Sequence, residues 1–132
     1  MDGIKTIASA FDPKQTMDRL DSAVRAKGMT VFARIDHAEG AREVGMTLRP
    51  TELLIFGNAR SGTPLMQARQ TIGLDLPLKA LVWQDPAGKT WLSYDEPQWI
   101  VSRHGPDPSL NGMADQMASV LAALTRTATA QP

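Results

Sequence analysis

Residues 50–97, PTELLIFGNARSGTPLMQARQTIGLDLPLKALVWQDPAGKTWLSYDEP, decide the fold. They predict a strand at residues 52–56, a glycine-bounded turn, a short helix and then a hairpin. The almost continuous apolar run of residues 53–56 is typical of a central strand that is covered on both faces. Thr63 and Pro64 form a capping residue followed by proline, so we expect the helix to begin there and to end at Gly73.

The hairpin is the clearest local prediction. Strands at residues 78–84 and 90–95 flank the tetrapeptide DPAG, residues 85–88, which suits a type I turn. Trp83 and Trp91 stand at nearly equal distances from this turn, so we expect them to be cross-strand neighbours. On a face without helices they would form a dimer surface or a stacking platform, and the balanced charge favours the dimer. The sequence therefore predicts a homodimer through the Trp83/Trp91 sheet face.

Working outward, strands are predicted at residues 3–8 and 30–36, and a helix runs from Asp12-Pro13 to Gly28. Residues 37–46 read as a short exposed helix or loop. A last helix follows Asp107-Pro108, with an apolar stripe over residues 110–124. The order β-α-β-(short α)-β-α-β-β-α predicts an α+β fold, a two-layer sandwich with a mixed sheet and helices on one face.

The domain organisation follows from this order. We expect one domain over residues 1–126 and a flexible tail over residues 127–132. The residues expected between sheet and helices are Leu53, Ile55, Leu78, Ala80 and Val82, packed against Leu20, Val24, Met117 and Leu121.

Composition excludes several classes of protein. The 14 basic and 14 acidic residues are scattered, so there is no footprint for nucleic acid or for an anionic membrane surface. The absence of cysteine excludes disulfides, thiolate catalysis and cysteine-ligated metals. Residues 1–11 lack the features of a signal peptide, and residues 53–56, the longest apolar run, are far shorter than the roughly 20 residues of a membrane helix. If Met1 is the native start, a soluble cytoplasmic protein is expected.

Five motifs together resemble the family called domain of unknown function 302. They are VFARIDH at residues 31–37, PTELLIFGN at 50–58, GTPLM at 62–66, GLDLP at 73–77, and the DPAG hairpin closed by YDEP at 94–97. The resemblance implies a small α+β domain, often dimeric, without an established activity. One departure is Ala59, which stands where a proline often follows the asparagine of the FGN motif. It is expected to make that turn less rigid.

Residues 57–63 are the best candidate for a ligand site. They lie between a strand and a helix N-terminus, where backbone N–H groups and the helix dipole favour an anion. The G-x-x-x-x-G spacing imitates the phosphate loop of NTPases, but Thr63 and Pro64 replace its lysine and hydroxyl residue, which excludes that hydrolytic mechanism. The alternative is a capped turn without a ligand. The candidate ligand-binding residues are Asn58, Arg60, Ser61, Gly62, Thr63 and His37.

His37 is the candidate catalytic residue. It follows Asp36 at a strand end, and an unperturbed histidine titrates near pH 6.5, so it could act as a general base with Asp36 or Glu39. The alternative is that Asp36 or His37 caps the next segment. His104 is expected to be exposed in a loop, and Asp75 to be a turn residue. Without cysteine and without an HxxxH or HExxH spacing, no metal or other cofactor is expected.

Three functions remain open. The first is a homodimeric module that binds a small anionic or polar ligand near residues 58–63 and His37. The second is an acid/base enzyme that uses His37, and the third is a structural or protein-interaction domain whose sheet face is its whole function. A closed pocket with a titrating group would favour the enzyme, whereas a flat aromatic face without a pocket would favour the third. The sequence favours binding over catalysis.

Overall fold

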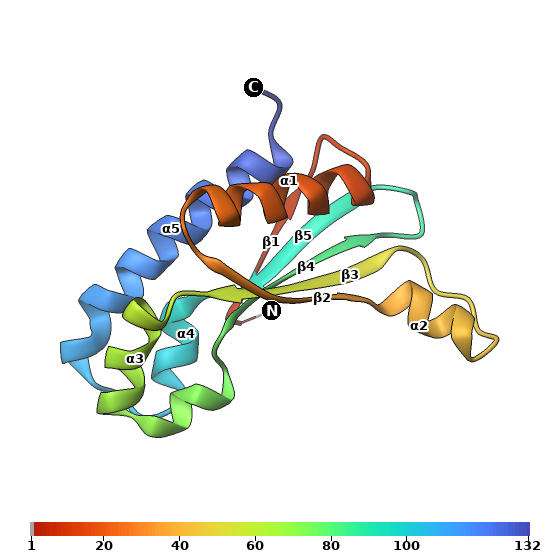
Figure 1. Ribbon diagram of the computed structural model, residues 1–132. Coiled ribbons are helices and arrows are strands. Elements are labelled where there is room, and N and C mark those ends of the chain that lie inside the picture. Colours follow the sequence, from red (N-terminus) through yellow and green to blue (C-terminus); the bar gives the residue numbers. More distant parts are fainter. Residues whose placement is uncertain (1) are drawn as a thin grey trace.

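The computed structural model describes residues 2–132 and confirms the predicted two-layer α+β sandwich (Figure 1). A five-stranded sheet forms one layer and helices form the other. The elements in chain order are β1 Ile4–Ala8, α1 Pro13–Ala26, β2 Thr30–Asp36, α2 His37–Glu43, β3 Thr51–Gly57, α3 Ala59–Ala68, the 3-10 helix η1 Gln70–Leu74, β4 Leu78–Gln84, β5 Thr90–Asp95, α4 Pro97–Ser102, the 3-10 helix η2 Pro108–Leu110, and α5 Asn111–Thr129.

The sheet has the strand order β1-β5-β4-β3-β2, and every neighbouring pair is antiparallel. The expectation of a mixed sheet was therefore wrong in this detail. It arose because α1 connects β1 and β2 as a crossover helix would connect two parallel strands. These two strands do run in the same direction, but they lie at opposite edges of the sheet and never pair.

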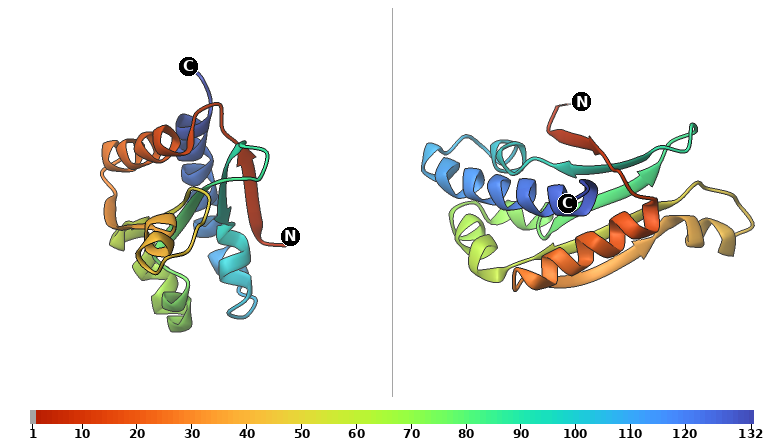
Figure 2. Two further views of the ribbon diagram at one scale, coloured as in Figure 1. Left: turned by 90° about the vertical axis from the view of Figure 1, so that its right-hand side faces the viewer. Right: turned by 90° about the horizontal axis from the view of Figure 1, so that it is seen from above.

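The two long helices, α1 and α5, pack against each other and cover the same face of the sheet (Figures 1 and 2). Asp12 caps α1 as the sequence predicts, since its carboxylate accepts a hydrogen bond from the Gln15 N–H at 2.7 Å. The core between the layers consists of large apolar side chains from α1, α5 and the three central strands. Its members include Met17, Leu20, Val24, Leu54, Phe56, Leu78, Ala80, Val82, Leu92, Leu121 and Leu124.

One part of the predicted core is on the wrong face of the sheet. Leu53 and Ile55 were expected beneath the helices, but Leu54 and Phe56 are the fully buried residues of β3. Residues of a strand alternate between its two faces, and a run of four apolar residues does not show which pair points to the core. The pairing of Leu54 with Ala80 and of Phe56 with Leu78 decides the matter.

The C-terminal tail is shorter than predicted. Helix α5 continues to Thr129, so the last three residues, rather than residues 127–132, lie beyond it. Two interactions explain the extension. Ala128 is completely buried in the core, and the Thr129 carbonyl accepts a hydrogen bond from the Ala10 N–H at 2.8 Å.

No helix of residues 2–132 covers the opposite face of the sheet (Figure 2). By the strand register its side chains are mainly apolar, with Lys79 and Asp95 as its charged residues. Trp83 and Trp91 are cross-strand partners there, as predicted, with ring centroids 6.2 Å apart. Both indole N–H groups are bonded within the chain, to Ser93 Oγ and to Asp85 Oδ2, each at 2.9 Å. We call this surface the open face; it comprises Ile4, Thr6, Ala8, Ala33, Ile35, Thr51, Leu53, Ile55, Lys79, Leu81, Trp83, Trp91, Ser93 and Asp95.

Helix α2 and residues 44–50 form an arm that extends past the end of the sheet (Figure 1). Three apolar side chains on this arm are strongly exposed: Val44 by 71%, Met46 by 66% and Leu48 by 44%. Within residues 2–132, no helix combines the length and the apolar character needed to cross a bilayer.

The placement of the core gives a direct stability prediction. Leu121→Ala should lower the free energy of unfolding by about 2–5 kcal/mol, because Leu121 is 1% exposed and its truncation leaves a cavity beneath the sheet. Leu74→Ala is the matched control, since Leu74 is 78% exposed and should change stability by less than about 0.5 kcal/mol. Urea unfolding measures both. Similar losses for the two variants would contradict this core.

Candidate functional site

Helix α3 begins immediately after β3, and Asn58 alone separates them. The predicted cap at Thr63 was therefore wrong: Asn58 is the N-cap, and its side-chain oxygen accepts from the Arg60 N–H at 2.8 Å. Pro64 lies inside the helix rather than at its first position. The Ser61 and Gly62 N–H groups both donate to the Asn58 carbonyl at 3.0 Å, so they are not free to bind an anion as the sequence suggested.

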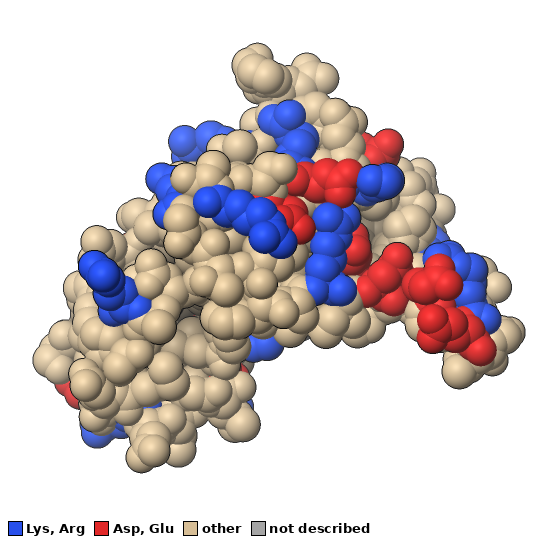
Figure 3. All heavy atoms as spheres, viewed as in Figure 1, with Lys and Arg blue, Asp and Glu red and all other residues tan. Residues whose placement is uncertain are grey.

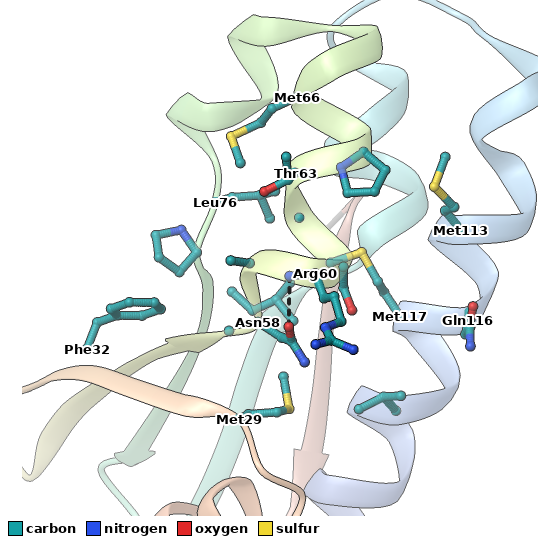
Figure 4. A pocket seen from close by; sticks show the side chains of 18 residues that line it. Met29, Phe32, Asn58, Arg60, Thr63, Met66, Leu76, Met113, Gln116 and Met117 are labelled. Atoms are coloured by element: carbon teal, nitrogen blue, oxygen red, sulfur yellow. Dashed lines mark hydrogen bonds between the residues drawn. The ribbon is translucent and has the colours of Figure 1, made fainter.

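The candidate residues of α3 nevertheless lie around a pocket of about 500 Å³ at the end of the sheet (Figure 4). Asn58, Arg60, Ser61, Gly62 and Thr63 all line it. The remaining lining comes from β2 and its approach, from the end of β3, from the rest of α3, from the chain before and into β4, and from α5. These residues are Met29, Phe32, Gly57, Ala59, Pro64, Met66, Leu76, Pro77, Leu78, Met113, Gln116, Met117 and Val120. We call this cavity the methionine pocket.

Methionines give the pocket its character. Four of the seven methionines in the chain line it, namely Met29, Met66, Met113 and Met117. All four are partly exposed, whereas Met17 is fully buried in the core. Unbranched, polarizable thioether side chains adjust their shape readily, and they are common on surfaces that accept varied apolar ligands. The walls of the pocket therefore suit an apolar molecule better than the bare anion that the sequence favoured.

Arg60 is the one ionisable residue among the eighteen that line the pocket. In Figure 4 its guanidinium group points away from α3, toward the space between Asn58 and Gln116. Within residues 2–132, this guanidinium takes part in no salt bridge and no hydrogen bond. The surface over α3 in Figure 3 is mainly uncharged, whereas acidic and basic side chains gather over α1 and α2. The pocket therefore combines apolar walls with a single positive charge.

His37 is not part of this site. It is the first residue of α2, at the far end of β2 from Thr30, which pairs with Gly57 beside the pocket. Seven residues of strand at about 3.3 Å each separate the two ends by roughly 20 Å. Asp36 caps α2, because its carboxylate accepts a hydrogen bond from the Glu39 N–H at 2.9 Å. Capping is the role that the sequence offers for this segment as the alternative to catalysis.

His104 was expected to be exposed, but only 7% of its side chain is accessible. Its Nε2 donates to Asp75 Oδ2 at 2.5 Å, and its Nδ1 lies 2.9 Å from the Thr71 hydroxyl. Arg103 also donates to Asp75 Oδ1, at 3.1 Å. The order hydroxyl, imidazole, carboxylate is that of a nucleophile, its general base and the carboxylate that orients the base. Thr71 does not line the methionine pocket, however, and the cluster joins η1 to the loop that follows α4.

Sequence reasoning missed this cluster because His104 is 29 residues from Asp75 and 33 residues from Thr71 along the chain. Asp75 is a turn residue as predicted, but it also anchors His104. Nearby, the hydrogen bond from the Ser109 hydroxyl lowers the pKa of Asp107.

One feature of the sequence could have indicated the methionine walls of the pocket. Met113 and Met117 are one helical turn apart, but this spacing is equally typical of an apolar stripe that faces the core.

Comparison with known proteins identifies the family. A sequence profile of "Domain of unknown function DUF302" matches residues 5–124. The chain belongs to the DUF302 family. An uncharacterized conserved DUF302 protein from Bacillus stearothermophilus has the same fold, with a TM-score of 0.86 and 22% identity over 97% of this chain and 99% of that one. The resemblance drawn from the five motifs is thereby confirmed.

Two curated relatives are named for a transport activity. The fluoride-specific ion channel FluC 1 of Brucella suis biovar 1 is 48% identical over 102 residues, which is 77% of this chain and 40% of that protein. The fluoride-specific ion channel FluC 2 of Brucella melitensis biotype 1 is also 48% identical over 102 residues, or 38% of its length. This chain thus spans well under half of the length of these relatives.

The two histidines provide a matched test of the His104 cluster. His104→Ala should lower the free energy of unfolding by about 1–3 kcal/mol, because it removes one partner of the largely buried Asp75 carboxylate. His37→Ala should change it by less than about 0.5 kcal/mol, since His37 is exposed and Asp36 supplies the cap. Denaturant unfolding at pH 7 distinguishes them. Equal effects would show that His104 is not a structural anchor.

Proposed function

We propose that this chain is a homodimeric module that binds a small, mainly apolar molecule carrying a polar group. The observation that carries the proposal is the methionine pocket, whose volume of about 500 Å³ falls in the usual range of roughly 300–1,000 Å³ for small-molecule sites. Burying apolar groups there would contribute about 0.8 kcal/mol per CH₂. The polar side chains of α3 would then orient the ligand at the mouth.

Binding is favoured over catalysis by the lining of the pocket. Its eighteen residues include no histidine, aspartate or glutamate, so they offer no side chain that commonly acts as an acid or base near neutral pH. His37, the acid/base candidate, lies at the other end of β2 and contributes nothing to this cavity. The enzyme alternative therefore lacks a substrate site next to its proposed base.

The open face supports the homodimer part of the proposal. Large apolar patches are uncommon on the surfaces of soluble monomers and usually mark interaction sites. Because Trp83 and Trp91 satisfy their N–H groups within the chain, their rings can be covered by a second copy without losing hydrogen bonds. The exposed apolar residues of the arm, Val44, Met46 and Leu48, would gain the same kind of burial. The cytoplasmic location remains a prediction.

A second candidate is suggested by the Brucella relatives that are named fluoride channels. The chain would then work beside a channel of this kind, and fluoride itself would be its anion. The unpaired guanidinium of Arg60 is the group that would attract a small anion in this site. The apolar walls, however, would give fluoride no compensation for its lost hydration.

A glycine pair tests the pocket. Gly62→Leu should abolish the amide NMR shifts that 1-octanol causes in α3 and α5, because a side chain there enters the cavity beside Leu76 and Met66. Gly40→Leu is the matched control: Gly40 is also helical, and nothing lies within 4 Å of a Cβ placed there. Both changes improve helix propensity, so folding should be retained.

The same spectra separate the two candidate ligands. Octanol shifts that vanish in Gly62→Leu and persist in Gly40→Leu support the apolar pocket. Octanol shifts that are absent, or that both variants retain, would remove the proposal. Shifts caused by millimolar sodium fluoride, but not by sodium chloride, would favour the fluoride candidate, and unchanged spectra would discard it.

The dimer is tested by sedimentation at micromolar concentration. We expect a dimer of the 14.3 kDa chain. Ile35→Lys should shift it toward monomer, because it places a charge on the open face at a residue that is 40% exposed within one chain. Ala123→Lys, on the exposed side of α5, should leave the dimer unchanged. A wild-type protein that sediments as a monomer would rule out this assembly.

A further inference from the structure

The charge and the lining of the methionine pocket also indicate the chemical class of its ligand. We propose that its ligand is an amphipathic monocarboxylate, with the carboxylate on Arg60 at the mouth and an unbranched or flat apolar body among the methionines. This inference rests on the proposed function, because it names the chemical class of ligand for the same pocket.

Arg60 supplies the recognition of the head group. It is exposed, it sits in the first turn of α3, and no acidic side chain in residues 2–132 is paired with it. A guanidinium group presents two parallel N–H donors that match the two oxygens of a carboxylate. The salt bridges that the structure describes are made elsewhere, on α1, β2, β3, α2 or the loops around η1 and α4. Arg60 is thus a cation left unneutralised beside an apolar cavity.

Neutral polar groups surround this cation. The Asn58 side-chain oxygen is occupied by the Arg60 N–H, which leaves its NH₂ group available. The Gln116 amide and the Ser61 and Thr63 hydroxyls also line the pocket, and their side chains form no hydrogen bond within the described part of the chain. These groups can donate to carboxylate oxygens that Arg60 does not occupy. Asn58 and Gln116 stand on opposite sides of the guanidinium in Figure 4.

The single charge argues for a monoanion. Among the lining residues there is no second lysine or arginine, and the rest of the wall is neutral. A phosphate monoester carries close to two negative charges at pH 7, so one of them would face apolar walls without a partner. A carboxylate carries one charge, which Arg60 neutralises. Charge balance therefore favours a carboxylate over a phosphate head.

Apolar side chains next to Arg60 would hold the apolar body of the ligand. In Figure 4 Met29 lies below the Arg60 guanidinium, Met117 lies beside it on α5, and Phe32 lies on the β2 side. Leu76, just before β4, also lines the cavity. Leu78, at 5% exposure, belongs to the core and also lines this cavity. An alkyl chain or a flat ring would therefore continue the hydrophobic core outward at the end of the sheet. Methionine side chains would adjust to its shape.

Calorimetric titration with octanoate, 1-octanol and octyl phosphate tests this inference. Octanoate should bind at least about tenfold more tightly than octanol, the usual scale of one charge-assisted hydrogen-bonded pair. Octyl phosphate should bind no more tightly than octanoate. From hexanoate to decanoate the affinity should rise by about two- to fourfold per CH₂, until the cavity is full.

Two arginine variants provide the control. Arg60→Gln should lower the affinity for octanoate to that for octanol, while Arg126→Gln, which removes the same charge from the exposed last turn of α5, should not. If octanol binds and octanoate binds no better, or if Arg60→Gln has no effect, the carboxylate inference fails and the apolar pocket stands. If neither compound binds, the proposed function fails with it.

Discussion

The direct junction between β3 and α3 sets the shape of the end of the molecule that holds the methionine pocket. With Asn58 alone between them, α3 must begin where the strand ends, and it packs mainly against η1 and α5 rather than over the sheet. The capping hydrogen bond, which the Arg60 N–H donates to the Asn58 side-chain oxygen, fixes the direction in which α3 leaves the sheet. The space left between α3, the end of the sheet and α5 is the methionine pocket, and the same junction places Arg60 at its mouth.

The sequence predicts the elements of this fold well where the signals are local. The Asp12 cap, the DPAG turn and the pairing of Trp83 with Trp91 follow from turn chemistry and spacing, and all are present. The sequence does not show which residues of β3 face the core, because its four successive apolar residues do not alternate with polar ones. The antiparallel sheet likewise depends on which edges β1 and β2 occupy, and this is a tertiary property.

The sequence identified a cavity-lining segment but not the apolar character of the cavity. Residues 58–63 were recognised from the glycines and the helix that follows, and they do line a cavity. The Thr63-Pro64 signal places the predicted N-cap five residues after the observed cap, Asn58, because proline is disfavoured inside a helix and Pro64 nevertheless lies within α3. The apolar walls come from Met29, Leu76 and α5, far away in sequence. The partnership of His104 with Asp75 was hidden for the same reason.

Methionine methyl groups offer the most direct test of the account, because the chain contains its own internal controls. In protein labelled with ¹³C at the methionine methyls, bound octanoate should show intermolecular NOEs to Met29, Met113 and Met117 of the pocket. It should show none to Met17, which is buried in the core, or to Met46, which is exposed on the arm. NOEs confined to Met46, or no NOEs at saturating octanoate, would contradict the claim that this pocket is the binding site.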